Sequence, residues 1–138
     1  MANRSFDDPA IQQCLSGTDV AVLAMVTPSG APLATPMWFV QDGTTLAMVS
    51  VDGLAKIRHL EADGRVSVVV EGGERGAIHG VVLAGEMRFL DGEERLLWGR
   101  RFRDKYTPAI DQLWGGAELP DDRRVFSCTP RVVSAFGI

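Results

Sequence analysis

Apolar positions along the chain change their spacing several times, and each change marks a predicted element. Residues 20–27 (VAVLAMVT) are apolar and rich in β-branched side chains, between Gly17 and the turn Pro28-Ser29-Gly30. Such a run, bounded by turn residues, is typical of a buried strand. Further runs of this kind bring the predicted strands to six, at Val20–Thr27, Ala31–Val40, Thr44–Val51, Arg65–Glu71, Ala77–Leu90 and Val125–Phe136.

Helical features replace the strand pattern in four places. Asp8-Pro9 combines an N-cap residue with proline at the first helical position, which predicts a helix directly after it. Apolar residues at helical spacing indicate the others. The predicted helices are Pro9–Leu15, Leu54 to Asp63-Gly64, Asp91-Gly92 to Tyr106, and Thr107-Pro108 to Trp114.

Some details of these elements can also be predicted. Asp52 precedes the second helix and is expected to be its N-cap. In the third helix, Leu96, Leu97 and Phe102 are expected to form the apolar stripe. The charged, glycine-rich segment Glu71–Gly76 is expected to be a loop.

Glycine and proline constrain how the strands assemble. The Asp-Gly turn at 42–43 is a strong hairpin signal, and strands joined by hairpins form an antiparallel sheet. Pro32 and Pro36 cannot donate to a strand ladder, so they indicate an edge or bulged strand. Gly80 and Gly85 are expected at bulges or bends of a curving sheet. The predicted fold class is therefore all-β dominated: a six-stranded antiparallel barrel with a few peripheral helices.

Composition narrows the range of functions. The 138 residues suffice for one core, so we expect a single domain over residues 1–138. A formal net charge of −4 argues against a nucleic-acid-binding surface. No segment has the length of a signal peptide or membrane span, so we expect a cytoplasmic protein with no membrane partner. Buried free thiols and the absence of a metal site are expected from the isolated positions of Cys14, Cys128, His59 and His79.

Two cations near the start of the second helix indicate an anion site. Lys56 lies in the first turn and Arg58 two residues later. Because a helix N-terminus carries partial positive charge and unpaired N–H groups, cations there are unfavourable unless an anion neutralises them. The alternative is that both side chains lie on a solvated face, paired with Glu61 and Asp63.

Adjacent aromatic residues in the second strand indicate a ring-binding surface. Trp38 and Phe39 must point to opposite faces of a strand, so one can enter the core while the other faces a cleft or a partner. Pro36 leaves neighbouring backbone groups free, and a planar ring could dock against them. The alternative is that both rings fill the barrel.

No motif for catalysis by the chain alone is present in the sequence. The serines lack a Gly-x-Ser-x-Gly context, and the sequence contains neither a GxGxxG nor a Walker motif. We therefore leave the catalytic residues unassigned. An enzyme of this composition would borrow its chemistry from a bound cofactor.

In order and spacing, these features resemble the pyridoxamine 5'-phosphate oxidase-like split-barrel family, whose members bind FMN or the deazaflavin F420. The resemblance extends from about residue 18 to the end of the chain. It rests on Val22–Pro32, Thr35–Val40 with Asp42-Gly43, Ala55–Leu60 with Asp63–Val68, and Asp122–Val125 with the closing strand.

The resemblance implies a split barrel and a homodimer with a cofactor site at the interface. It places a flavin-like ring over the strand around Pro36, Met37 and Trp38. It assigns the phosphate to the Ala55-Lys56 and Arg58 motif and to the backbone near Ser50 and Val51. Family members often carry a polar or basic residue where this chain has Gly53-Leu54, which implies a weaker hold on the phosphate or a different cofactor.

Two functional hypotheses follow. The first is a reductase that transfers a hydride between bound F420 or FMN and a small conjugated molecule such as a quinone, an enone or a tetrapyrrole. The second is a non-catalytic carrier of a cofactor, haem or tetrapyrrole, with His59 or His79 as an axial ligand of haem.

Overall fold

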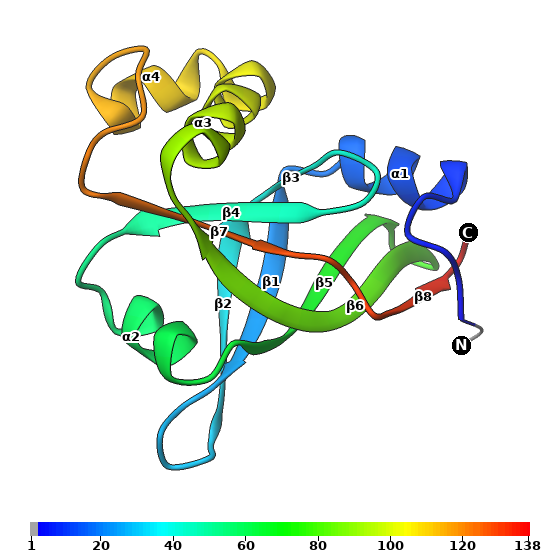
Figure 1. The fold of residues 1–138 in the computed structure, drawn as a ribbon. Helices are drawn as coiled ribbons and strands as arrows, with labels where there is room; N and C mark the ends of the chain where they lie inside the picture. The colour runs from blue at the N-terminus through cyan, green and yellow to red at the C-terminus, as the bar shows by residue number, and fades with distance from the viewer. Residues whose placement is uncertain (1–2) are drawn as a thin grey trace.

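The strands of the protein form one strongly curved antiparallel sheet with helices at its margins (Figure 1). The computed structural model describes residues 3–138. Within them the sheet has eight strands in the order β2-β1-β5-β6-β7-β4-β3, and β8 pairs with β6. The strands are β1 Val20–Val26, β2 Pro32–Trp38, β3 Val40–Gln41, β4 Leu46–Val51, β5 Arg65–Glu74, β6 Ala77–Leu90, β7 Arg123–Cys128 and β8 Val132–Phe136. The helices are α1 Pro9–Ser16, α2 Ala55–Ala62, α3 Gly92–Tyr106 and α4 Ala109–Trp114.

This architecture confirms the predicted β-dominated barrel with peripheral helices. All six predicted strands are present, and two of them are interrupted. One interruption separates β2 from β3 at Phe39, and the other separates β7 from β8 at residues 129–131. Because Pro130 cannot donate to a ladder, the second break was predictable. β2 is an edge strand, as the two prolines predicted.

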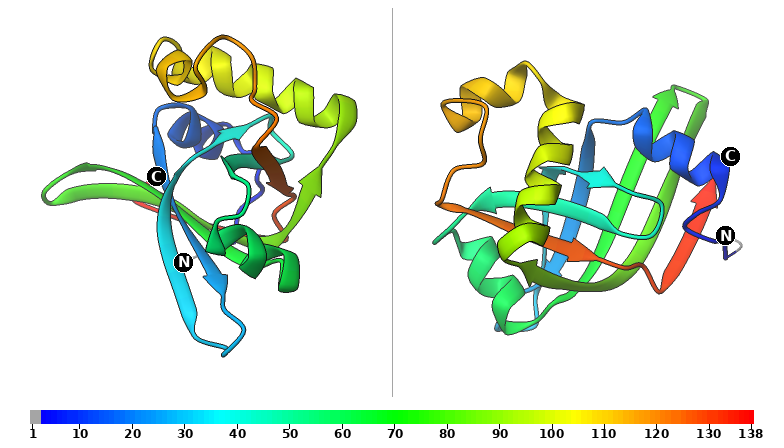
Figure 2. Two further views of the ribbon diagram at one scale, coloured as in Figure 1. Left: turned by 90° about the vertical axis from the view of Figure 1, so that its left-hand side faces the viewer. Right: turned by 45° about the horizontal axis from the view of Figure 1, so that its top comes forward.

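Three detailed predictions are wrong. The segment Glu71–Gly76 is not a loop, because β5 continues to Glu74 and pairs with β6 up to the turn. This hairpin extends away from the barrel (Figure 2, left). Asp52 does not cap α2: the N-cap position is Leu54, and the Asp52 carboxylate instead accepts a hydrogen bond from the backbone of Gly53.

The third correction concerns the apolar stripe of α3. Phe102 is buried as predicted, but Leu96 and Leu97 are exposed, and Trp98, Gly99 and Tyr106 are buried in their place. The helix is therefore rotated relative to the prediction: the ring-bearing side chains cover the sheet, and the leucines face solvent. Periodicity could not decide between these faces, because both carry apolar residues.

β6 is the strand on which the curvature depends. It pairs with β5 over residues 77–86, with β8 over residues 80–84 and with β7 over residues 87–90. Bulges or bends were predicted on this strand: the register with β5 is continuous through Gly80 and Gly85, so neither is a bulge, and β6 curves instead (Figure 1). Both glycines instead allow neighbouring segments to approach the backbone of β6 closely. A Cβ at Gly85 would lie 2.5 Å from Cys128 Sγ, and one at Gly80 would lie 2.7 Å from the carbonyl oxygen of Val70.

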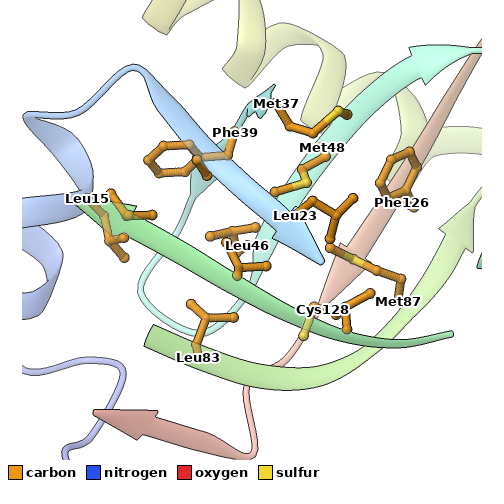
Figure 3. Close-up of a cluster of buried hydrophobic side chains, with 14 of the residues drawn as sticks. Leu15, Leu23, Met37, Phe39, Leu46, Met48, Leu83, Met87, Phe126 and Cys128 are labelled. Carbon is orange, nitrogen blue, oxygen red and sulfur yellow. The ribbon is translucent and has the colours of Figure 1, made fainter. Parts of the chain in front are cut away.

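Two apolar clusters hold the sheet. The larger fills the barrel with side chains from α1, α2 and most strands, among them Leu23, Phe39, Met48 and Phe126 (Figure 3). The smaller lies between the sheet and the helices α3 and α4, of which α3 crosses the face of β4 and β7 (Figure 2, right). Within residues 3–138, no helix is long and apolar enough to span a membrane.

Replacing Gly80 with alanine tests the close approach on β6. The added Cβ would lie 2.5 Å from the ring of Phe136 and 2.7 Å from a backbone oxygen, so β8 must shift. We expect G80A to lower the free energy of unfolding by about 1–3 kcal/mol in urea titrations. The matched control is G116A, where an added Cβ meets nothing within 4 Å. Equal stability of the two variants would contradict this account.

Candidate functional site

A cavity lies where the barrel is split, between β2 and β4. β2 pairs on one side only, with β1, and β4 pairs with β3 only at Leu46 and Ala47. Residues 48–51 of β4 therefore have a strand partner on one edge only, from β7. The cavity has a volume of about 260 Å³. It is lined by Pro36, Met37, Trp38, Val49, Ser50, Val51, Lys56, Phe102, Ile110, Leu113, Trp114 and Arg123.

Trp38 forms the aromatic wall of this cavity. Its ring is stacked on that of Tyr106, with centroids 4.3 Å apart and planes 2° from parallel. Phe39 points the other way and is fully buried in the barrel core. The structure thus confirms that the two adjacent rings serve opposite faces, and it shows that Trp38 is the ring at the cavity.

The hydroxyl of Tyr106 maintains the break between β2 and β3. The backbone N–H of Phe39 donates to it at 2.9 Å, and the carbonyl oxygens of Phe39 and Asp19 lie 2.7 and 2.8 Å from it. Burial raises the pKa of Tyr106 well above its ordinary value. The phenol therefore stays neutral and keeps a proton to donate.

Lys105 adds a half-buried cation behind this wall. Its ammonium donates to the carbonyl of Phe39 at 3.1 Å and lies 3.8 Å from the centroid of the Phe39 ring. Burial lowers the pKa of Lys105 to about 8, although the negative charge of Asp19 opposes the shift. Sequence reasoning did not identify this lysine, because nothing in the local pattern marks which face of α3 is buried.

Lys56 reaches the cavity without a carboxylate partner. Its Nζ lies 3.4 Å from Met37 Sδ, and it forms no ion pair with any acidic side chain of residues 3–138. Glu61 pairs with Arg124 and Asp63 pairs with Arg65. The alternative interpretation, in which Glu61 and Asp63 neutralise Lys56 and Arg58, is therefore wrong.

The predicted site residues divide into two groups. Pro36, Met37, Trp38, Ser50, Val51 and Lys56 all line the cavity. Ala55 and Arg58 do not: Ala55 is exposed at the start of α2, and the Arg58 guanidinium donates to the carbonyl of Gly53 at 2.7 Å. Lys56 is thus the cation of the predicted pair that the fold brings to the cavity.

The remaining wall was not predicted from the sequence. Phe102, Ile110, Leu113 and Trp114 cover the cavity from α3 and α4, and Arg123 reaches it from the start of β7. Leu113 is 61% exposed despite its apolar side chain. The doublet Arg123-Arg124 carried a usable signal, because successive strand residues point to opposite faces.

Comparison with known proteins assigns the chain to a family. The family model for pyridoxamine 5'-phosphate oxidase matches residues 7–136, nearly the whole chain. The chain belongs to the pyridoxamine 5'-phosphate oxidase family. No curated protein gives a significant match to it.

Solved structures confirm the fold of this family. The conserved hypothetical protein Rv2991 from Mycobacterium tuberculosis is 24% identical with a TM-score of 0.78, over 94% of this chain and 83% of that protein. A heme binding protein from Mycobacterium smegmatis is 20% identical with a TM-score of 0.76, over 99% of this chain and 56% of that one. A structure described as an F420 reductase is 22% identical with a TM-score of 0.69, over 89% and 94%. At these identities, the likeness establishes the fold and leaves the function open.

Replacing Tyr106 with phenylalanine tests how the aromatic wall is held in this member of the pyridoxamine 5'-phosphate oxidase family. The variant keeps a ring to stack on Trp38 but leaves the buried N–H of Phe39 without its acceptor. We expect Y106F to lose about 1–3 kcal/mol of unfolding free energy in chemical denaturation. Wild-type stability in Y106F would show that the hydroxyl is not needed at the strand break.

Proposed function

We propose that the cavity binds a phosphorylated flavin-type cofactor, F420 or FMN, and that the protein is a reductase acting on a small conjugated molecule. One observation carries the proposal: an aromatic wall, two incompletely paired strand edges and a lysine without a carboxylate partner meet in one cavity. Membership of the pyridoxamine 5'-phosphate oxidase family and the shared fold of an F420 reductase support it.

The residues present fit such a cofactor. A flavin or deazaflavin has an aromatic body and a pyrimidine edge that carries N–H donors and carbonyl acceptors. Trp38 offers a flat surface to the body, and the backbone of residues 48–51 offers hydrogen bonds to an edge, since no second strand consumes them. Lys56 would bind the phosphate, because a charge-assisted hydrogen bond to an anion is roughly twice as strong as a neutral one.

When bound, either cofactor supplies hydride transfer. The chain would contribute position and exclusion of water. Phe102, Ile110 and Trp114 cover the cavity with apolar surface, so a conjugated substrate would be held against the ring system away from bulk solvent. The protein's cytoplasmic location stays a prediction from the sequence.

We also propose that two copies of the chain form the site. The cavity, at about 260 Å³, is small for a phosphorylated three-ring cofactor, because drug-sized ligand sites usually measure about 300–1,000 Å³. Completion by a second subunit would enlarge it. The outer face of the sheet supplies a surface for such a partner.

Part of that face is free of charge across five strands, between Glu71 on one side and the paired residues Arg65 and Glu86 on the other. Strand register places two cross-strand rows on it: Pro36, Val22, Val69, Val82 and Ser134 in one row, and Ala34, Ala24, Ser67, Ala84 and Val132 in the other. All ten residues are exposed or partly exposed. A contiguous apolar face of this kind marks an interaction site in a soluble protein. Because Pro36 belongs both to this face and to the cavity, a partner would lie next to the cofactor.

A charge placed on this face tests the dimer. Val22 is 37% exposed and lies within the first row. We expect V22E to shift the protein from dimer to monomer in light scattering coupled to gel filtration, because a buried unpaired carboxylate opposes association. L96E, on the outer side of α3, is the control and should stay dimeric. A wild-type monomer, or a dimeric V22E, would contradict the proposal.

Titration with FMN and F420 tests the cofactor, with Lys56 as the probe residue. We expect one of the two to bind the wild-type protein, and K56Q to weaken its Kd at least tenfold. R88Q removes the same charge from an exposed side chain on the far end of β6 and should bind like wild type. Unchanged affinity in K56Q would remove Lys56 from the site, and failure of both cofactors to bind would overturn the proposed function.

If the protein binds haem through a histidine, the haem site must lie outside this cavity. Neither histidine lines the cavity: His59 is on α2, and His79 lines a separate cavity with Cys14 and Thr18. Haem binding is the second candidate function because a heme binding protein shares this fold. A Soret band that develops on adding haem, and that is lost in H79A or H59A, would favour it over the reductase.

A further inference from the structure

Arg123 is a second cation on the wall of the same cavity, and it comes from a different side of the fold than Lys56. Lys56 lies against Met37, at the β2 wall. The Arg123 Nη2 atom instead donates to the carbonyl of Leu113 at 3.0 Å, at the end of α4. The two charges therefore stand at different parts of the cavity, one beside the proposed phosphate position and one beneath the apolar cover.

The charge of Arg123 is incompletely neutralised. Its side chain is only 17% exposed, whereas that of its ion-pair partner Asp122 is 63% exposed and solvated. An exposed carboxylate offsets only part of a neighbouring charge, because water screens the pair. Among the residues that the structure describes, no carboxylate lines the cavity itself. Electrostatically, the site is a positive pocket in a chain with a net charge of −4.

Arg124, the next residue of β7, has a structural role and provides a comparison. Arg124 points to the opposite face, where it pairs with Asp52 and Glu61 and lies 4.2 Å from the centroid of the Phe89 ring. Its planar group is satisfied by the protein on several sides. Arg123 is held by the Leu113 carbonyl and one exposed acid, which leaves donors free to face a ligand.

We propose that Arg123 binds an acidic group of the substrate, and that the substrates are planar, largely apolar molecules bearing a carboxylate or a similar anion. This inference rests on the proposed function in placing the cofactor phosphate at Lys56. The apolar body would lie under Phe102, Ile110 and Trp114, and the acid would meet Arg123 near Leu113. Arg123 sets specificity because a neutral analogue would leave its charge without a partner.

The cofactor-free protein provides the test, with 2-naphthoate as the probe and 2-naphthamide as its uncharged match. The two share an aromatic body and differ in charge. We expect isothermal titration calorimetry to give a Kd about tenfold lower for the acid than for the amide with wild-type protein. In R123Q the two should bind within about twofold of each other. A preference for the acid that persists in R123Q would overturn the assignment.

Two further variants separate this role from a purely structural one. D122N removes the exposed partner and keeps Arg123, so the acid should bind more tightly while the amide is unchanged. A structural role in holding α4 would not produce that gain, and its absence would contradict the inference. R124Q removes the neighbouring charge on the opposite face and should keep the wild-type preference for the acid.

The K56Q variant shows whether Lys56 or Arg123 binds the acid. If K56Q, and not R123Q, abolishes the preference for naphthoate, the acid occupies the Lys56 position and the proposal is wrong. Because no cofactor is present, these titrations are independent of FMN and F420 binding. If K56Q loses cofactor binding but keeps the preference for naphthoate, both proposals are supported. If the wild-type protein binds the cofactor but shows no preference for naphthoate, only the Arg123 proposal is overturned.

Discussion

The contact between the Tyr106 hydroxyl and the backbone of Phe39 is the constraint on which the site depends. At Phe39 the chain leaves β2 and enters β3, so its peptide groups have no strand partner. A buried backbone N–H without an acceptor is costly, and the phenol supplies the acceptor from a helix 67 residues away. That helix is anchored in turn by Trp98 and Phe102, which are buried in the same apolar cluster as Tyr106.

The same residue sets the geometry of the cavity. The Tyr106 ring lies flat against Trp38, so the hydroxyl that satisfies the backbone and the ring that supports the wall belong to one side chain. Separation of β2 from β4 opens the barrel and leaves two strand edges incompletely paired. The cavity with its defined walls lies at this interruption of strand pairing.

Much of this could be predicted from the sequence, because the signals are local. The turn residues and apolar runs define the strands, the pair Trp38-Phe39 indicates one ring inside and one outside, and Lys56 at a helix start indicates an anion. What could not be predicted depends on tertiary packing. The face of α3 that is buried, the position of α4 over the cavity and the role of Tyr106 all follow from how a helix late in the chain docks on an early strand. Arg58 illustrates the same limit: it lies two residues after Lys56, about half a turn around the helix from the position that reaches the cavity.

Charge and assembly are linked through this geometry. An acidic chain that gathers Lys56 and Arg123 in one cavity, with no acid lining it, concentrates positive potential where apolar walls exclude water. Electrostatic interactions strengthen as water is excluded, so each cation gains in effect if a second subunit covers the open side. The charge-free rows of the sheet face meet the cavity at Pro36, which is the side such a subunit would close. Dimer formation and anion binding would then reinforce each other, because the partner that removes water from the cavity also raises the cost of leaving its two cations without a ligand.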